Sequence, residues 1–290
     1  MSDISVVAVT YDSADVVDAF LASLDAASVR STAVTVIGNG SVDGTLERLA
    51  AHRGCEVVRA PDNGGYGAGA NLGVRRSATD WVVVANPDIV FHPGSLDELL
   101  AVSRRWPRAG AIGPRILTAD GRLYPSAREL PSLGRGIGHA VFGWFWPTNP
   151  WTRSYRREQG APAEGRVGWL SGACLMVNRK AFDAVGGFDQ TYFMYFEDVD
   201  LCERLARAGW DVVYGPSATI EHLGGHAASR NLVGMSRAHH DSAYRYLSRR
   251  YAGARWLPVR AALRAGLWAR FRVSTVIERL AHGAEPTRPG

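Results

Sequence analysis

Short apolar runs that alternate with helical patterns over about the first hundred residues constrain the fold more than any other feature of this sequence. The runs cover residues 4–9, 34–37, 55–59 and 81–85, and the segments between them have the three-to-four spacing of amphipathic helices. This alternation predicts an α/β fold with a doubly wound, mostly parallel sheet. Because the run at 81–85 is apolar throughout, we expect that strand near the centre of the sheet.

Polar clusters follow three of these four predicted strands. They are residues 10–12, residues 38–45 and the tripeptide at 86–88. Ligands of open α/β sheets bind beyond the carboxyl ends of the strands, so one edge of the sheet is the predicted site. The carboxylate of Asp88 suits Mg²⁺ or Mn²⁺, which use one or two carboxylates together with phosphate oxygens. The alternative is a simple turn that ends the strand.

A glycine-rich segment at residues 63–71 precedes a predicted helix. Its spacing does not match the dinucleotide-binding fingerprint. Two interpretations stay open, namely a loop whose backbone N–H groups approach a phosphate or sugar and an ordinary flexible connection.

Three carboxylates crowd the start of another predicted helix, at Glu197, Asp198 and Asp200. Their mutual repulsion predicts that at least one has a perturbed pKa, unless a cation or a substrate relieves it. The alternative is a capped, solvated helix start. Small residues around Gly172, within a strand predicted over 167–177, leave room for a ligand to approach closely.

The positive charge of the chain is concentrated at its C-terminal end. Residues 226–290 hold 12 of the 33 basic side chains but only 3 of the 28 acidic ones. Such a tail suits nucleic acid or an anionic membrane surface. We expect it to be helical from 237 to 280 with a break near Pro258, and residues 283–290 to be disordered.

Other segments indicate a cytoplasmic protein without a membrane span. No window holds eighteen apolar residues, the start lacks a signal-peptide pattern, and Cys55, Cys174 and Cys202 lack metal-ligand spacing. The stretch at 122–166 is rich in aromatic residues and arginines and predicts a loop for a membrane interface or an apolar acceptor. Packing over the sheet is the alternative. We therefore expect a catalytic domain over 1–226 and a basic helical extension over 227–290.

The motifs at 9–11, 39–45, 63–71, 86–88 and 196–202, in this order and spacing, resemble the family 2 inverting glycosyltransferases of the GT-A fold, which is Rossmann-like. The likeness runs from residue 4 to about residue 226. Within the family the chain resembles bacterial rhamnosyltransferases of cell-wall linker or O-antigen assembly.

This resemblance implies transfer of L-rhamnose from dTDP-L-rhamnose to N-acetylglucosamine (GlcNAc) on a polyprenyl diphosphate, with an α-1,3 linkage. It also implies a divalent cation (Mg²⁺ or Mn²⁺) and work at the inner face of an anionic membrane. The alternatives are another donor, such as galactofuranose, mannose or a different deoxysugar, and a non-catalytic protein that binds nucleic acid or membrane.

The resemblance also assigns roles to residues. Asp198 corresponds to the general base, and Asp88 and His222 to metal ligands, although a lone histidine is more often structural. The nucleotide-sugar site would include Thr10, Tyr11, Asp12, Asn39, Asp43, Asn63, Gly65, Asn71 and Asn86. The acceptor side would include Trp169, Gly172, Glu197 and Asp200.

Two positions depart from the family pattern. Gly38 stands where an aspartate usually helps to recognise the pyrimidine, and Asn86 replaces the first acid of the metal motif. The first departure leaves recognition of the base open. The second indicates weaker metal binding or an indirect role for this residue.

Overall fold

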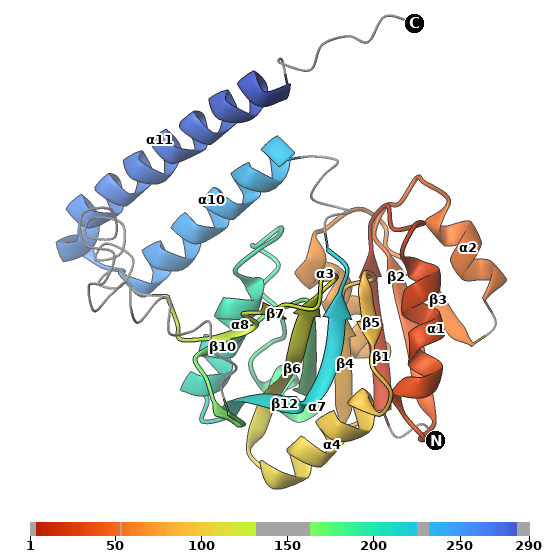
Figure 1. Ribbon diagram of the computed structural model, residues 1–290. Helices are drawn as coiled ribbons and strands as arrows, with labels where there is room; N and C mark the ends of the chain where they lie inside the picture. Colours follow the sequence, from red (N-terminus) through yellow and green to blue (C-terminus); the bar gives the residue numbers. More distant parts are fainter. Residues whose placement is uncertain (1–3, 53, 132–162, 225–231, 283–290) are drawn as a thin grey trace, which may run out of the picture.

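The structure is a computed structural model that describes residues 4–52, 54–131, 163–224 and 232–282. Its centre is a ten-stranded sheet whose main path runs β3-β2-β1-β4-β11-β6-β12-β5 (Figure 1). The strands of this path are β1 (Ile4–Thr10), β2 (Thr32–Gly38), β3 (Cys55–Arg59), β4 (Trp81–Ala85), β5 (Ile89–Phe91), β6 (Ala109–Thr118), β11 (Cys174–Asn178) and β12 (Asp211–His222). Short strands β7 (Leu123–Tyr124) and β9 (Gly165–Arg166) pair with β6 and β12, and β8 (Ala127–Arg128) pairs with β10 (Trp169–Leu170) in a separate sheet.

The first four predicted strands are confirmed, and they form the parallel half of the sheet, with β1 between β2 and β4. The next strand, β11, is antiparallel to both of its neighbours, so that β6 and its parallel partner β12 run in the same direction as β4. The single strand predicted over 167–177 is wrong. The chain forms β10 and β11 with a turn between them, because the N–H of Ser171 donates to Ser126 O and that of Gly172 to a side chain, so neither joins the main sheet.

Helices cover both faces of the sheet and create two apolar cores. Alternate residues of β1 point to opposite faces, so that Val6 lies in one core and Val7 in the other. The first core is closed by α1 (Val17–Ala27), α2 (Thr45–Ala51) and α4 (Ser95–Arg105), and the second by α3 (Tyr66–Arg76), α7 (Arg179–Ala184) and α8 (Glu197–Arg207).

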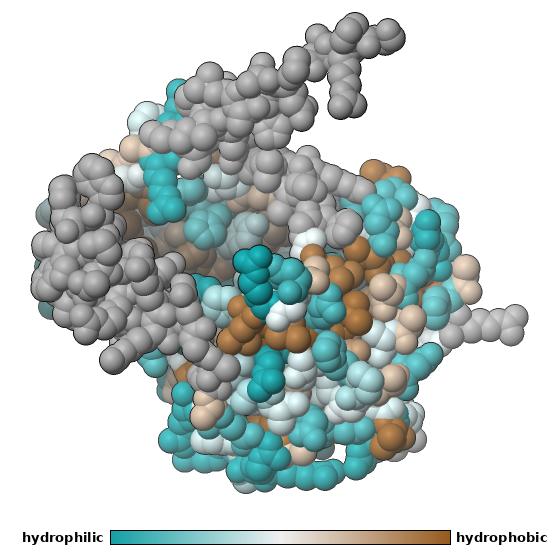
Figure 2. Space-filling view, in the orientation of Figure 1, coloured by the Kyte–Doolittle hydropathy of each residue, from teal (hydrophilic) through white to brown (hydrophobic). Residues whose placement is uncertain are grey.

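Helix α3 lies very close to β1. A Cβ atom at Gly73 would come within 2.2 Å of a methyl group of Val7, so only glycine permits this approach. The close packing fixes the start of α3 against the ends of β1 and β2, where the predicted ligand edge lies. In the view of Figure 2, hydrophilic side chains cover most of the lower body of the molecule.

Two helices follow the sheet and run side by side outside it (Figure 1). They are α10 (Leu232–Arg250) and α11 (Leu257–His282), with a short 3₁₀ turn, η1 (Ala254–Trp256), between them. The predicted helical tail with a break near Pro258 is thus confirmed. Pro258 occupies the first turn of α11, where its missing N–H has no intrahelical partner to lose. Among the described residues, no helix has the length and apolar character needed to cross a bilayer.

Several expectations fall on residues outside the described ranges. They include most of the aromatic and arginine-rich stretch at 122–166, the domain boundary at 226 and the disorder expected over 283–290. The boundary stays a prediction. Helix α10 nevertheless packs on the sheet domain, since Tyr246 lies in one cluster with Tyr192 and Val199.

Candidate active site

The ends of β1 and β2 are joined by hydrogen bonds that build one side of the predicted ligand edge. The N–H of Asn39 donates to Thr10 O at 2.9 Å. The N–H of Asp12 donates to Ser41 Oγ at 3.1 Å, and Asp12 Oδ1 accepts the N–H of Val42 at 2.9 Å. Asp12 itself has a left-handed backbone with φ of 48°. These contacts hold the two predicted polar clusters together.

Asp43 anchors the same edge from the second loop. Its carboxylate accepts the N–H of Ala14 at 3.0 Å and the N–H of Thr45 at 3.1 Å, as well as the Thr45 hydroxyl. Burial by itself raises the pKa of Asp43, but these hydrogen bonds outweigh it and lower the pKa. Asp43 is therefore an ionised support of the loops. The neighbouring Tyr11 ring is 43% exposed.

Asn39 is buried beneath these loops. Its Nδ2 donates to Asn63 Oδ1 at 2.9 Å and to Gly65 O at 3.2 Å. Its Oδ1 is buried and has no hydrogen-bond partner among the described residues. A buried acceptor without a partner is costly, so this oxygen suits a donor group on a ligand.

Gly38, where the family usually has an aspartate, is packed against another side chain. A Cβ atom at this position would lie 2.4 Å from Leu46 Cδ2. Leu46 therefore fills space that an acidic side chain would need. Among the described residues, the polar group at the end of β2 is therefore the side-chain amide oxygen of Asn39. No carboxylate occupies position 38.

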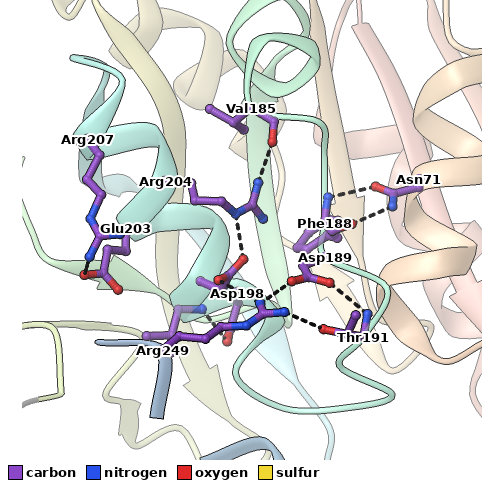
Figure 3. A network of polar contacts seen from close by, with 12 residues as sticks. Asn71, Val185, Phe188, Asp189, Thr191, Asp198, Glu203, Arg204, Arg207 and Arg249 are labelled. Carbon is purple, nitrogen blue, oxygen red and sulfur yellow. Dashed lines mark hydrogen bonds and ion pairs between the residues drawn. The ribbon is translucent and has the colours of Figure 1, made fainter. Parts of the chain in front are cut away.

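Gly65 and Asn71 contact the protein instead of open space. A Cβ atom at Gly65 would lie 2.1 Å from Phe193 O, and φ at Gly65 is +86°. Asn71 accepts the N–H of Phe188 at 2.9 Å and donates to its carbonyl at 2.8 Å (Figure 3). Since Asn71 is 3% exposed, both polar atoms of its amide are used to join α3 to the segment before α8. This arrangement gives Asn71 contacts within the protein, and its expected role in the nucleotide-sugar site stays a prediction.

Asp88 and His222 meet at the ends of two neighbouring segments. The N–H of Leu223 donates to Asp88 O at 2.9 Å, and Asp88 Oδ1 lies 3.1 Å from His222 Nε2. Asp88 Oδ1 nevertheless accepts no hydrogen bond within the described residues, so the two atoms are close but not aligned as donor and acceptor. The ring of Tyr124 packs edge-on against the imidazole at 6.0 Å.

This pair fits a divalent cation that shares its remaining positions with a substrate. Ligand atoms at about 2.1 Å around Mg²⁺ lie about 3 Å from their neighbours, which is the separation seen here. In the part of the chain that the structure describes, no group of three or more His, Cys, Asp and Glu side chains is arranged so that it could hold a metal ion. Mg²⁺ typically takes one or two carboxylates and completes its shell with phosphate oxygens and water.

A chain of hydrogen bonds connects the metal motif to the predicted base. The N–H of Asn86 donates to Ala173 O at 2.9 Å, and the N–H of the preceding Gly172 donates to Asp198 Oδ2 at 2.8 Å. The Tyr66 hydroxyl donates to Gly172 O at 2.7 Å. The turn between β10 and β11 therefore brings the end of β4, the start of α3 and the start of α8 to one place.

Tyr66 was not among the predicted site residues, although it is the first residue of α3. Burial raises its pKa well above the ordinary value, and the charges of Glu197, Asp198 and Asp88 raise it further. The three carboxylates therefore lie near a single phenol. The position of Tyr66 within the glycine-rich segment was the available signal.

Glu197 is buried and Asp198 beside it is half-buried, and the pKa of each is raised, in line with the perturbed pKa that the crowding predicted. Burial raises the pKa of Glu197, and the charge of Asp198 raises it further. Burial also raises the pKa of Asp198, against the opposing effect of the N–H groups of Gly172 and Val199. Glu197 Oε2 has no partner within the described residues, whereas both oxygens of Asp198 accept backbone N–H groups. A shared proton is therefore better placed on Glu197, with Asp198 ionised.

Two other residues expected at the acceptor side have partners elsewhere. Asp200 accepts a hydrogen bond from Arg204 at 2.7 Å and lies 4.0 Å from Arg249. The indole N–H of Trp169 donates to Glu129 O at 3.1 Å, and Arg128 lies over its ring. Their acceptor roles stay predictions, and the structure gives both residues contacts that stabilise the fold.

Helix α10 holds the segment that leads into α8, a feature that the sequence patterns did not reveal. The Ser242 hydroxyl donates to Met194 O at 2.8 Å. Arg249 hydrogen bonds to Asp189 and, at 3.3 Å, to Thr191 (Figure 3). The segment needs support because Tyr195 and Phe196 are both left-handed with φ of 67°, which is strained for aromatic residues.

Comparison with known proteins places these features in context. A model of a family described as glycosyltransferase like family 2 matches residues 2–238. An N-acetylglucosaminyl-diphospho-decaprenol L-rhamnosyltransferase of Mycobacterium tuberculosis is 48% identical over 281 residues, which is 92% of this chain and 91% of the relative. The rhamnosyltransferase WbbL of Escherichia coli is 30% identical over 195 residues, 64% of this chain and 71% of that protein.

Solved structures with similar folds are more distant in sequence. The crystal structure of S. aureus TarS 1-349 has a TM-score of 0.53 at 15% identity, covering 83% of this chain and 65% of TarS 1-349. A structure of GalNAc-T7 with UDP, GalNAc and Mn²⁺ has a TM-score of 0.55 at 13% identity, over 77% of this chain and 44% of that one. These likenesses support the expected GT-A fold.

Proposed function

The chain belongs to the family of glycosyltransferases described as like family 2, and from this premise we propose that it moves L-rhamnose from dTDP-L-rhamnose to GlcNAc-diphospho-decaprenol. The observation that carries the proposal is the 48% identity over 92% of the chain with a relative that is named for this transfer. The meeting of the metal motif and the buried acid pair at one turn supports it.

Asp198 is the proposed base of an inverting transfer. Its carboxylate removes the proton of the acceptor 3-hydroxyl while that oxygen attacks the anomeric carbon of rhamnose. The C–O bond to the nucleoside diphosphate breaks on the opposite face, and dTDP leaves. The N–H of Gly172, 2.8 Å from Oδ2, orients the carboxylate. Burial raises the pKa of Asp198 toward the working pH, which strengthens it as a base.

Asp88 and His222 are the proposed protein ligands of Mg²⁺ or Mn²⁺. The cation would neutralise charge on the diphosphate as it leaves. Asn86, adjacent to the turn that orients the base, lies where the usual first acid of the motif would be. Its backbone N–H holds Ala173, so its contribution in this proposal is to align the two sides of the site.

The paired loops after β1 and β2 are the proposed nucleotide site, with Thr10, Tyr11 and Asp12 on the first loop. The unpartnered Oδ1 of Asn39 matches the N3–H donor of thymine. Asn63 supports Asn39 through the hydrogen bond between their side chains. Since uracil carries the same N3–H group, this contact recognises a pyrimidine and leaves the choice of sugar to other residues.

The test is transfer itself. Purified protein with dTDP-rhamnose, Mn²⁺ and a GlcNAc-diphospho-polyprenol should form a disaccharide lipid with an α-1,3 linkage, detected by mass spectrometry and NMR. The D198N variant serves as the negative control. Transfer from another nucleotide sugar but not from dTDP-rhamnose would overturn the proposed donor and favour the galactofuranose, mannose or other deoxysugar alternatives.

The non-catalytic alternative is less well supported. A protein that binds only nucleic acid or membrane through its basic tail has no need for buried carboxylates beside a metal-binding pair. Thermal stabilisation by dTDP-rhamnose that depends on a divalent cation would exclude this alternative.

A further inference from the structure

Helix α11 has apolar residues on two faces. One row, at spacings of four, packs toward α10, which is the main neighbour of α11 among the described elements. These half-buried side chains are Val259, Leu263, Leu267 and Phe271. Phe271 lies 6.0 Å from the ring of His240 on α10. This row accounts for the packing of the two helices.

The other face of α11 is exposed and almost as apolar. Leu257 is 55% exposed and Trp268 is 63% exposed. The exposed positions between and beside them are Pro258, Ala261, Ala262, Ala265, Gly266 and Ala269. From 257 to 272 the sequence contains no Ser, Thr, Asn, Gln, Asp or Glu. The outward face of a helix in water is normally polar, so this face indicates a second environment.

The only polar side chains in that stretch are arginines. Arg264, Arg270 and Arg272 are exposed. The guanidinium of Arg272 lies over the ring of Trp268 at 5.6 Å, and that of Arg264 over Tyr244 at 5.8 Å. The sequence has no acidic residue between 242 and 277 to neutralise them. The face therefore combines apolar area, an interfacial tryptophan and uncompensated positive charge.

We propose that this outward face of α11, formed by Leu257, Trp268 and Arg272 with the small residues between them and bordered by Arg264, which also contacts Tyr244 of α10, lies on the surface of an anionic phospholipid bilayer. Small apolar side chains and a tryptophan enter the interface, while arginines reach the phosphates of the headgroups. Each basic residue near such a surface strengthens binding by about fivefold. The occupant is thus a lipid surface, recognised by its charge and its apolar interior.

The biological purpose of this membrane contact rests on the proposed function. The contact would orient the active site toward the bilayer. Helix α11 packs on α10, and α10 holds the segment that carries Asp198 through Ser242 and Arg249. A bilayer under α11 would therefore place the acceptor side of the site near the membrane in which the polyprenyl chain is anchored. The lipid-linked sugar then needs to travel only a short distance to the base.

The test uses the full chain and vesicle sedimentation. Vesicles of phosphatidylglycerol with phosphatidylcholine should bind the protein at low salt, and pure phosphatidylcholine should bind it far less. The R264E/R272E variant should lower the partition coefficient at least about 25-fold, and W268S should lower it about tenfold. The R75E/R104E variant, which makes the same charge change at exposed positions on α3 and α4, should bind as the wild type does.

Three outcomes would overturn the inference. The first is equal binding of the wild type to neutral and anionic vesicles, or no binding to either. The second is an equal loss of binding in R75E/R104E, which would indicate a diffuse charge effect. The third is a dimer in sedimentation velocity that W268S converts to monomer, which would make this face a contact between two copies of the chain.

Failure of this inference is separable from failure of the proposed function. Donor binding and transfer to a water-soluble GlcNAc-diphosphate analogue should be unchanged in R264E/R272E, because these arginines contact neither substrate in the proposed site. Vesicle binding in turn is measured without donor or acceptor. A protein that binds vesicles as expected but transfers no rhamnose would retain the membrane surface and lose the proposed reaction.

Discussion

The two sides of the candidate site are built in different ways. On the donor side, side chains join loops that lie 24 to 32 residues apart and follow β1, β2 and β3. On the acceptor side, the segment before Asp198 is held by side chains of α10 that lie 48 to 60 residues further along the chain. The donor side is thus formed by loops between neighbouring parallel strands. The acceptor side depends instead on α10, which lies outside the sheet.

This difference predicts that the two sides can be damaged separately. Changes at the base or at α10 should lower turnover and leave donor binding intact. Changes at the metal pair should weaken donor binding first. Four variants sharpen the comparison, in order of decreasing effect.

The largest effect is expected for D198N. Asparagine can still accept the N–H of Gly172 but cannot take a proton, so turnover should fall about a thousandfold. The dissociation constant of dTDP-rhamnose, measured by calorimetry, should change less than about twofold. A parallel loss of donor affinity would show that the two sides are one unit and would break the comparison.

The next variant, D88N, tests the donor side. Loss of the carboxylate from the metal pair should weaken binding of dTDP-rhamnose about 10- to 100-fold and raise the Mn²⁺ concentration needed for half-maximal activity. Calorimetry with a chelator provides the control, since the wild type without metal should resemble the variant. Unchanged donor affinity in the wild type after chelation would contradict the assignment of Asp88 and His222.

The third variant, R249M, removes the support that α10 gives to the acceptor side. Turnover should fall about tenfold, because a small displacement of the base is costly, while donor affinity should not change. The control is R237M, on the same helix, whose guanidinium lies 3.6 Å from Asp241 one turn away. Equal losses in both variants would point to general destabilisation of α10.

The same variant has a pH signature in stability. Burial of Asp189 would raise its pKa, but hydrogen bonds from Arg249 and from the N–H of Thr191 lower it to about 2. A carboxylate whose pKa is lower in the folded state stabilises the fold at pH values above its unfolded pKa of about 4. This stabilisation is lost as the pH falls. Melting temperatures of wild type and R249M should therefore differ most at neutral pH and converge as the pH falls from about 4 to about 2.

The smallest effect is expected for E197Q. Glutamine mimics the protonated Glu197, so Asp198 keeps a neutral neighbour and the acidic limb of the pH–rate profile should stay in place. Turnover at neutral pH should stay within about tenfold of the wild type. An acidic limb that moves to lower pH would show that Glu197 is charged while Asp198 titrates and does not carry the shared proton.

The sequence predicted the donor side better than the acceptor side, for a physical reason. Apolar runs identify strands, and the carboxyl ends of parallel strands must lie at one edge, so residues 10–12, 38–45 and 86–88 were placed together by local patterns. The contact partners of individual residues in these loops could not be predicted from the sequence. Asn71 and Gly65 lie in the expected loop and helix, but they contact Phe188 and Phe193, which are more than a hundred residues away.

On the acceptor side, the three acids at 197–200 were identified, but their separate environments were not. Asp198 and Asp200 lie on different faces of α8, so that one accepts the N–H of Gly172 and the other pairs with Arg204. The basic tail also looked uniform in sequence. In the structure Arg249 and Arg250 on α10 pair with Asp189 and Glu203, while Arg264 and Arg272 of α11 lie over aromatic rings. Only tertiary contacts separate these roles.

The antiparallel direction of β11 beside β4 has an evolutionary consequence. One side of the candidate site consists of loops that leave strands, and the other side includes a turn that enters β11. Insertions or substitutions in the entering turn and its flanking segments can alter which acceptor is glycosylated without disturbing the loops proposed to grip the nucleotide. A scaffold divided in this manner can diversify the polymers that a cell envelope contains while continuing to draw on one pool of activated sugar.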